Sequence, residues 1–454
     1  MDNKIFFDEM LAKGREAQKA FEQFSQEDVD KAVRAIGKVV YDNADELAKM
    51  AAEETGMGKY EDKIVKNMGK PKAVWNKLKG VKSRGIVAYH EEDGLVDVAK
   101  PMGVIGCVTP TTNPTMTPVH NAMIALKGGN AVIISPHPRS KKTTAKTVEY
   151  MRQALKDVGA PENLIQNIDE PSLELSQMTM ERCDVCISTG GPQMVKSAYS
   201  SGKPAFGVGP GNVQCLVNHD ADPHDYVPKV VKGRTYDNGV LCTCEQSLIL
   251  PQHLHDQTVD MLVASGGHFI HEPHEVDALR SVLFPEGRIA PKMVGAHPFN
   301  IAKEAGILVP EDVKFLMVSI DKTGKDEYLA KEKLAPVLAV YKYNDWKDAV
   351  DIAVDNLNNE GAGHSAVIHS DSTEDIEYAS LRLPVSRIGI KMVGSSGLGG
   401  GFDNGLNPTA TLGCGSWGNN SISENLWWNH LVNMSKIAYL LPDKKIPTDE
   451  EIWN

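Results

Sequence analysis

Two cysteines lie close together in the segment YDNGVLCTCEQS, residues 236–247, and either could act as a nucleophile. Asp237-Asn238-Gly239 is a turn-forming sequence, and the apolar run Leu248–Leu250 predicts a strand. This arrangement places Cys242 and Cys244 at the rim of an element, where a small electrophile can reach a thiol. A structural cysteine lies more often inside an apolar run. The spacing alone does not distinguish the two thiols.

An asparagine occupies a second position that could do chemistry. Residues 103–108 predict a buried strand, residues 117–127 predict a helix, and Asn113 lies in the polar turn Thr109–Pro118 between them. Its amide could donate a hydrogen bond to a developing oxyanion, and the helix N-terminus would add positive potential. An ordinary helix cap followed by proline explains the same residues equally well.

Two turns after predicted strands are candidates for cofactor binding. Thr189-Gly190-Gly191 lets the backbone approach a pyrophosphate, although it is short and is not a GxGxxG motif. Ser135–Lys142 follows the strand 131–134, where the adenosine ribose of a cofactor would be recognised, and offers no acidic residue for a ribose 2′-hydroxyl. Four residues there could hold a 2′-phosphate instead: Arg139, Ser140, Lys141 and Lys142. A solvated start of a basic helix explains them too, so NADP fits this segment and NAD remains open.

The cysteine spacing gives no reason to expect a metal site. Seven cysteines, an odd number scattered along the chain, suit free thiols in a reducing compartment. A zinc site usually brings its CxxC on a loop with a matching second pair. Cys183 and Cys186 instead lie in a run that predicts a strand, where side chains three residues apart point to opposite faces.

The elements that must position these residues alternate along the chain. Helical spacing of apolar residues predicts a helical layer over 8–82, with one helix starting near Ser25. From Met102 strands alternate with helices, which predicts parallel sheets in a doubly wound α/β architecture. The expected strands are 103–108, 131–134, 164–168 and 185–188, and the expected helices are 117–127, 141–157 and 192–199.

A polar hairpin interrupts this pattern. Gly85–Tyr89 and Leu95–Ala99 flank a turn, and such a hairpin in an α/β chain often pairs with another subunit. Trp427, Trp428 and Trp453 indicate a C-terminal segment buried against the core or a neighbour. We therefore expect a cofactor-binding domain at 1–82 and 101–233, a catalytic domain at 234–415, and an oligomerisation arm and tail at 83–100 and 416–454.

Composition excludes several classes of function. The chain has 454 residues, 41% of them hydrophobic, which is enough for a large core. A net charge of −12 argues against nucleic acid or a membrane surface as the main partner. No apolar run approaches the roughly 20 residues of a membrane span. The charged, amphipathic N-terminus lacks the features of a secretory signal, so we expect a cytoplasmic protein.

Taken in order, these motifs resemble those of the aldehyde dehydrogenase superfamily, along essentially the whole chain. The resemblance is closest to the CoA-acylating branch, which includes acetaldehyde, succinate-semialdehyde and sulfoacetaldehyde enzymes. The matching segments are the Asn113 turn, Thr189-Gly190-Gly191, Val208–Asn212, the cysteine segment, Glu332–Val337, Gly413–Gly418 and Ser421–Asn425.

The resemblance implies a role for individual residues. Cys242 takes the position of the catalytic nucleophile, Asn113 and a backbone N–H near Cys242 hold the oxyanion, and His364 lines the active site. Glu332 binds the nicotinamide ribose. The other implied cofactor contacts, with NADP or NAD, are Thr111, Thr112, His137, Pro138, Arg139, Ser140, Lys141, Thr189, Gly190, Gly191 and Gly209.

One departure from the hydrolytic relatives bears on the product. Those enzymes carry a Glu, in a Glu-Leu-Gly-Gly motif, that activates water against the enzyme thioester. The matching segment here, Gly207–Asn212, contains no carboxylate. Without a general base the attack of water is slow, and the resemblance implies that coenzyme A takes the acyl group as co-substrate.

The aldehyde is expected to be short and to carry an anionic tail, as in succinate semialdehyde or sulfoacetaldehyde. An alkyl tail would call for aromatic or aliphatic residues, whereas hydroxyls, a helix N-terminus and a lysine suit a carboxylate or sulfonate. The residues expected to face the substrate are Thr117, Asn121, Thr243, Lys391, Ser395 and Ser396.

Alternatives remain at this point. Acetaldehyde is the second candidate substrate, and a phosphate-releasing acyl-phosphate reductase shares the fold and a cysteine. A non-enzymatic scaffold is disfavoured because Asn113, Cys242 and Glu332 are all present. The hairpin and the tail predict a homodimer or homotetramer.

Overall fold

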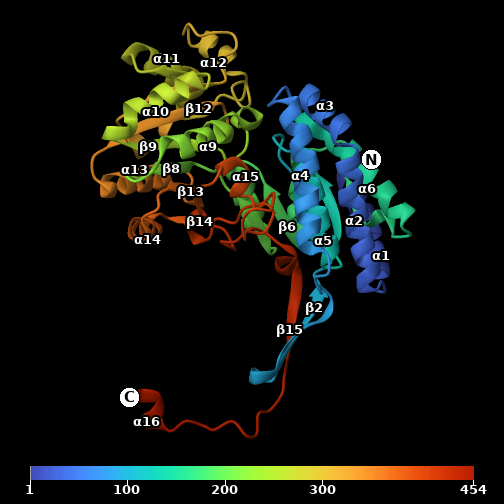
Figure 1. Ribbon diagram of the computed structural model, residues 1–454. Coiled ribbons are helices and arrows are strands. Elements are labelled where there is room, and N and C mark those ends of the chain that lie inside the picture. Colours follow the sequence, from blue (N-terminus) through green and yellow to red (C-terminus); the bar gives the residue numbers. More distant parts are fainter. Residues whose placement is uncertain (1) are drawn as a thin grey trace.

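The computed structural model describes residues 2–454 as two α/β lobes with a projecting arm (Figure 1). The first lobe contains a five-stranded parallel sheet in the order β5-β4-β3-β6-β7. Its strands are β3 (Val104–Val108), β4 (Ala131–Ser135), β5 (Ile165–Asn167), β6 (Val185–Thr189) and β7 (Ala205–Val208). Its helices are α1 (Asn3–Phe21), α2 (Gln26–Asp42), α3 (Ala44–Thr55), α4 (Tyr60–Leu78), α5 (Met116–Lys127), α6 (Lys141–Asp157), α7 (Leu173–Arg182) and α8 (Pro192–Tyr199).

The second lobe contains a seven-stranded parallel sheet in the order β10-β11-β12-β9-β8-β13-β14. Its strands are β8 (Val213–Val217), β9 (Glu245–Pro251), β10 (Gly267–Ile270), β11 (Phe315–Ser319), β12 (Val337–Tyr343), β13 (Gly363–His369) and β14 (Val385–Ile390). Its helices are α9 (Pro223–Thr235), α10 (Gln252–Ala264), α11 (Pro273–Leu283), α12 (Pro298–Glu304), α13 (Trp346–Asn359), α14 (Thr373–Arg382) and α15 (Gly394–Gly397).

The arm is a three-stranded antiparallel sheet in the order β1-β2-β15. The expected hairpin is present as β1 (Gly85–His90) and β2 (Leu95–Pro101), and β15 (Val432–Ala438) pairs with β2 from the far end of the chain. Beyond the arm the tail runs away from both lobes to the short helix α16 (Asp449–Trp453) (Figure 1).

Local sequence explains most of these elements. Ser25 caps α2, its Oγ accepting the N–H of Asp28 at 3.1 Å. Every residue of β3, β4 and α5 is buried, as expected for strands covered on both faces and for a helix in the middle of a core. Among the described residues, no helix combines the length and the apolar character needed to span a membrane.

Three details differ from the sequence-based expectation. The sheets divide between β7 and β8, near residue 210, because β8 pairs with β9 and β13; the sequence placed the division near 233. Cys183 ends α7 and does not lie in a strand, since β6 begins only at Val185. In the C-terminal segment Trp427 is buried in the core of the first lobe, whereas Trp453 is 81% exposed.

Candidate active site

The cysteine segment begins with a left-handed turn. Asp237, Asn238 and Gly239 have φ values of 50°, 51° and 66° in succession, a backbone that Asp, Asn and Gly adopt more readily than other residues. Asn238 Nδ2 donates to the carbonyl of Gly295 at 3.1 Å. The buried Arg234 donates to the carbonyls of Gly239 and Glu245, on either side of the two cysteines. The turn and the arginine together fix the loop that presents the thiols.

Exposure separates the two thiols. Cys242 is partly exposed, whereas Cys244 is fully buried. The chain at Cys242 passes directly over Gly211, where a Cβ would lie 2.2 Å from the Cys242 carbonyl oxygen. Burial raises the pKa of the Cys242 thiol, the Glu332 carboxylate adds to that rise, and Arg387 opposes it. Cys242 is therefore the accessible thiol, and its thiolate needs help from its surroundings.

Asn113 lies in the turn after β3 and is held through its amide oxygen. Lys66 Nζ, from α4, donates to Asn113 Oδ1 at 2.7 Å and to Asp237 Oδ2 at 2.6 Å. Because Asp237 precedes Cys242 by five residues, this chain of contacts connects the asparagine to the cysteine loop across the two lobes. The amide nitrogen of Asn113 is left to serve as a donor.

Glu332 reaches the same region from the segment before β12. Its Oε1 accepts the N–H of Gly211 at 2.9 Å, and burial raises its pKa to about 8. The neighbouring Lys333 is completely buried, with Nζ donating to the carbonyls of Leu329 and Lys331 at 2.7 and 2.9 Å. Lys333 thus fixes the segment before β12, and the Glu332 carboxylate faces Gly211, which lies under Cys242.

His364 is buried near the start of β13. Neither ring nitrogen has a hydrogen-bond partner among the described residues. Burial, with Arg387 adding to it, lowers the pKa of His364 to about 3, so the ring is neutral. The neutral imidazole can donate a hydrogen bond to an entering ligand or accept one from it. Arg387 itself is occupied by the carbonyls of Gly413 and Ser423.

The loops expected to bind a dinucleotide meet at one edge of the five-stranded sheet. The chain proceeds from β3 to β4 and β5 in one direction and from β6 to β7 in the other, so the topological switch point lies between β3 and β6. Thr111 and Thr112 follow β3, while Thr189 ends β6 and Gly190-Gly191 leads into α8. Open α/β sheets bind nucleotides at this place. A Cβ at Gly191 or Gly209 would meet no described atom within 4 Å, so both backbones have open space beside them.

The residues expected at the adenosine ribose differ in their exposure and in their partners. His137, Pro138 and Arg139 are exposed, Ser140 is buried, and Lys141 pairs with Glu170. No acidic residue lies in this segment itself, but Glu54 of α3 reaches it. Both Glu54 oxygens accept backbone N–H groups at the start of α6, from Lys142 at 2.8 Å and Thr143 at 2.7 Å. The positive end of α6 is therefore already capped, which leaves Arg139 and Lys142 as exposed cations of this segment.

The expected substrate contacts divide into two groups. Thr117 and Asn121 are buried on α5, Thr243 Oγ1 donates to the Ser395 carbonyl at 3.2 Å, and Ser396 is exposed. Lys391 does not fit the expectation, because both oxygens of Asp371 hold its ammonium, at 2.7 and 2.8 Å. The carboxylate satisfies the charge that was expected to attract an anionic tail.

Another lysine, which sequence reasoning missed, lies close to Cys242. Lys70 Nζ donates to the carbonyls of Gly399 and Gly400 at 2.9 and 3.4 Å, in the loop that follows Ser396. Burial lowers its pKa to about 8, and the Cys242 thiolate opposes that shift. Lys63, Lys66 and Lys70 lie three to four residues apart on α4, which places them on one face of the helix.

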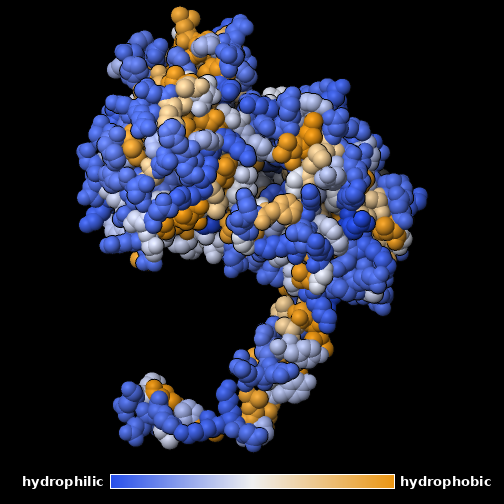
Figure 2. Space-filling model, viewed as in Figure 1, coloured by the Kyte–Doolittle hydropathy of each residue, from blue (hydrophilic) through white to orange (hydrophobic). Residues whose placement is uncertain are grey.

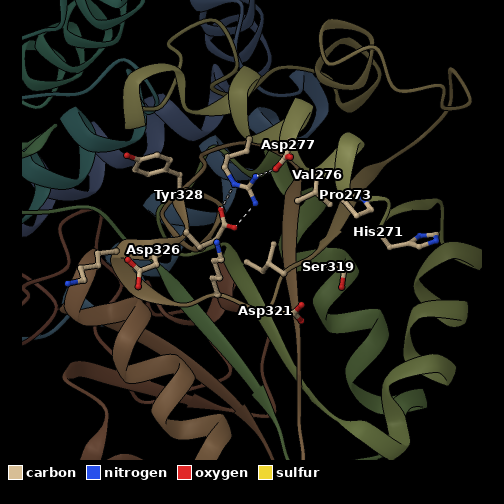
Figure 3. A pocket seen from close by; sticks show the side chains of 13 residues that line it. His271, Pro273, Val276, Asp277, Ser319, Asp321, Asp326 and Tyr328 are labelled. Carbon is tan, nitrogen blue, oxygen red and sulfur yellow. Dashed lines mark hydrogen bonds and ion pairs between the residues drawn. The ribbon is translucent and has the colours of Figure 1, made fainter.

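The cavity shown in Figure 3 lies elsewhere, at the carboxyl ends of β10 and β11. It measures about 550 Å³ and shares no lining residue with the cysteine loop. Arg280 crosses it and is fully engaged, by Glu327 at 2.7 and 2.8 Å and by Asp277. Among residues 2–454, no group of three or more His, Cys, Asp or Glu side chains is placed to hold a metal ion.

Comparison with known proteins agrees with this geometry. Residues 3–269 match the sequence profile described as the aldehyde dehydrogenase family. The chain belongs to the aldehyde dehydrogenase family. It is 48% identical, over the full length of both chains, to an acetylating succinate-semialdehyde dehydrogenase of Clostridium kluyveri.

Two solved structures extend the comparison within the aldehyde dehydrogenases. An acetylating aldehyde dehydrogenase of Geobacillus thermoglucosidasius superposes with a TM-score of 0.92 at 35% identity, covering 97% of each chain. A propionaldehyde dehydrogenase of Rhodopseudomonas palustris, solved with bound CoA and an acylated cysteine, has a TM-score of 0.85 at 26% identity and covers 95% of this chain and 96% of its own. The relatives are thus acylating enzymes, and the α/β fold is shared along the chain.

Proposed function

We propose that this aldehyde dehydrogenase converts a short aldehyde with an anionic tail to its acyl-CoA, using NAD(P)⁺ and coenzyme A. The observation that carries the proposal is the environment of Cys242. Cys242 is the partly exposed cysteine of the loop, and the adjoining segment Gly207–Asn212 contains no carboxylate. The acetylating relative from Clostridium kluyveri supports the same reaction.

The chain's residues account for formation of the thioester. The Cys242 thiolate forms a C–S bond to the aldehyde carbon, and the carbonyl electron pair moves to the oxygen. The amide N–H of Asn113 stabilises that oxyanion. The loops after β3 and β6 and Glu332 would hold NAD(P)⁺, which would supply the acceptor for the hydride that leaves the carbon when the carbonyl re-forms. The carbon is oxidised and remains bonded to Cys242 as a thioester.

Release of the acyl group requires a second nucleophile. The thiolate of coenzyme A bonds to the thioester carbon, the bond to Cys242 breaks, and Cys242 leaves as a thiolate. His364, neutral and without a hydrogen-bond partner in the described chain, can accept a hydrogen bond from the coenzyme A thiol, whose proton passes to solvent. Glu332 lies outside the Gly207–Asn212 segment, and we assign it to the nicotinamide ribose; one of its oxygens already accepts the Gly211 N–H.

The substrate's tail is expected to interact with Lys70. Its ammonium is bonded only to carbonyl oxygens, so its charge is not neutralised by a carboxylate, unlike that of Lys391. Thr243 and Ser395 add small polar groups, and Ser395 Oγ is buried without a partner among the described residues. These features favour succinate semialdehyde or sulfoacetaldehyde over acetaldehyde.

The decisive experiment measures reduction of NAD⁺ and NADP⁺ with succinate semialdehyde, sulfoacetaldehyde and acetaldehyde, each with and without coenzyme A. We expect turnover to require coenzyme A and to favour an anionic aldehyde. Equal turnover without coenzyme A would mean that water reaches the thioester, and the acylating assignment would fail.

We also propose that the arm assembles the enzyme into a homodimer or homotetramer. β1 and β15 are both edge strands. Figure 2 shows apolar residues, in orange, among polar ones along the projecting arm. Ile437, Tyr439 and Leu440 are 40%, 63% and 88% exposed in the single chain. Such a surface favours a second copy of the chain. Sedimentation that detects only monomer at micromolar protein would overturn the assembly.

The unpaired cysteines suit a reducing compartment such as the cytoplasm.

A further inference from the structure

The orientation of Asn113 is determined by a lysine from the helical layer. Lys66 Nζ contacts Asn113 Oδ1 at 2.7 Å, and an ammonium group can only donate hydrogen bonds. The atom of the amide that faces Lys66 must therefore be the oxygen. The nitrogen of Asn113 then points away from Lys66 and keeps its N–H groups for another acceptor.

Asp237 holds that lysine in place. Its side chain is fully buried, and its left-handed backbone, with φ of 50°, turns the carboxylate toward α4. Oδ1 accepts the backbone N–H of Lys59 at 2.7 Å, while Oδ2 accepts Lys66 at 2.6 Å and Lys63 at 3.1 Å. One carboxylate thus serves two ammonium groups, whose side chains are only 10% and 4% exposed.

The consequence is an ammonium group held directly against the amide oxygen of Asn113. Burial would raise the pKa of Asp237, but Lys66 and Lys63 outweigh it and keep the carboxylate ionised. A cation at the oxygen of an amide draws electron density from its nitrogen and makes the N–H a stronger donor. The same contact fixes Asn113, in the first lobe, relative to the cysteine loop of the second.

We propose that Lys66, anchored by Asp237, is a positioning residue that orients and polarises the Asn113 amide toward the oxyanion formed on the Cys242 adduct. The inference rests on the proposed function, because it assigns Lys66 no contact with the substrate and acts only through Asn113. It deepens that function by explaining how a freely rotating amide is preorganised for a charge that appears only during the reaction.

The test is Lys66→Met in the full-length enzyme with NAD(P)⁺, coenzyme A and the preferred aldehyde. Removing an oxyanion donor outright costs about 10²–10³-fold, so losing only its orientation is expected to lower kcat by about 10- to 100-fold, with KM for the aldehyde changed by less than about threefold. Alkylation of Cys242 by iodoacetamide builds no oxyanion, so its rate is expected to stay the same. Lys66→Arg is expected to recover part of the loss.

Lys63→Met is the matched control. Lys63 lies on the same helix and binds the same carboxylate oxygen, but it has no contact with Asn113. This variant is expected to lose less than about threefold in kcat. In both variants Asp237 keeps one lysine and the Lys59 N–H, so the fold is expected to survive, which thermal unfolding checks.

Combining Lys66→Met with Asn113→Ala separates the possible failures. If Lys66 acts through Asn113, the double variant is no slower than Asn113→Ala alone. Independent, multiplying losses, or a parallel loss of iodoacetamide reactivity, would overturn the positioning role and leave the proposed function intact. Full turnover by Asn113→Ala alone would overturn the oxyanion role itself, and this inference with it.

Discussion

The cysteine site and the cavity of Figure 3 both lie among loops at the ends of parallel strands, but they differ in what their less exposed charged and polar groups are bonded to. Lys70, which lies close to Cys242, meets only carbonyl oxygens, and His364, expected to line the same site, has no partner among the described residues. In the cavity, Arg280 is fully paired with Glu327 and Asp277. A cavity of about 550 Å³ does not make a site when its buried charges are already satisfied.

The largest effect expected on the cysteine side comes from Cys242→Ala. Loss of the nucleophile should reduce aldehyde-dependent turnover by on the order of 10⁴-fold or more. Cys244→Ala should keep turnover within about threefold, because that thiol is fully buried. Assays of both variants, with mass spectrometry of the acylated protein, decide the matter. Acyl transfer to Cys244 would reverse the assignment.

The second test addresses the charge of Lys70. Lys70→Met should raise KM for an anionic aldehyde by about 10- to 100-fold, because a charge-assisted contact is lost, and leave KM for acetaldehyde nearly unchanged. Lys391→Met is the control, since Asp371 already neutralises that ammonium. Equal losses for charged and uncharged aldehydes would mean that Lys70 only supports the Gly399–Gly400 loop.

The third prediction concerns pH. Burial raises the pKa of Cys242, so little thiolate is present at neutral pH. The thiolate fraction grows up to tenfold for each unit by which the pH increases. Iodoacetamide alkylation of Cys242 should therefore speed up steadily from about pH 6 to about pH 9. A rate that is flat over this range would show that the free enzyme already holds a thiolate.

The smallest effect on turnover is expected at the cavity. Arg280→Gln should leave kcat unchanged but lower the free energy of unfolding by about 1–3 kcal/mol, because it leaves the buried Glu327 carboxylate without its cation. Urea unfolding and a turnover assay measure the two quantities. A marked loss of turnover without loss of stability would show that the cavity and the cysteine site are coupled.

Local sequence predicted the strands and helices of the first lobe and the cysteine loop, because periodicity and turn residues act over short distances. It could not identify Lys66 and Lys70. Lysines on one face of a helix have the pattern of a solvated surface, and only the approach of the second lobe buries them. Glu54 was missed for the same reason, since it reaches the start of α6 from a helix about 90 residues earlier. Lys391 was misjudged because its partner, Asp371, comes from the adjacent strand's loop.

The arm also has a consequence for synthesis. Lys436 of β15 binds Asp97 of β2 across 339 residues of chain. At roughly 5–20 residues per second, a ribosome needs about 20–70 s to produce β15 after β2 has emerged. Throughout that interval the hairpin presents a bare edge to the crowded interior of the cell. Neighbouring nascent chains on one messenger carry the same bare edge, and the assembly proposed for the arm would let them join before either is complete.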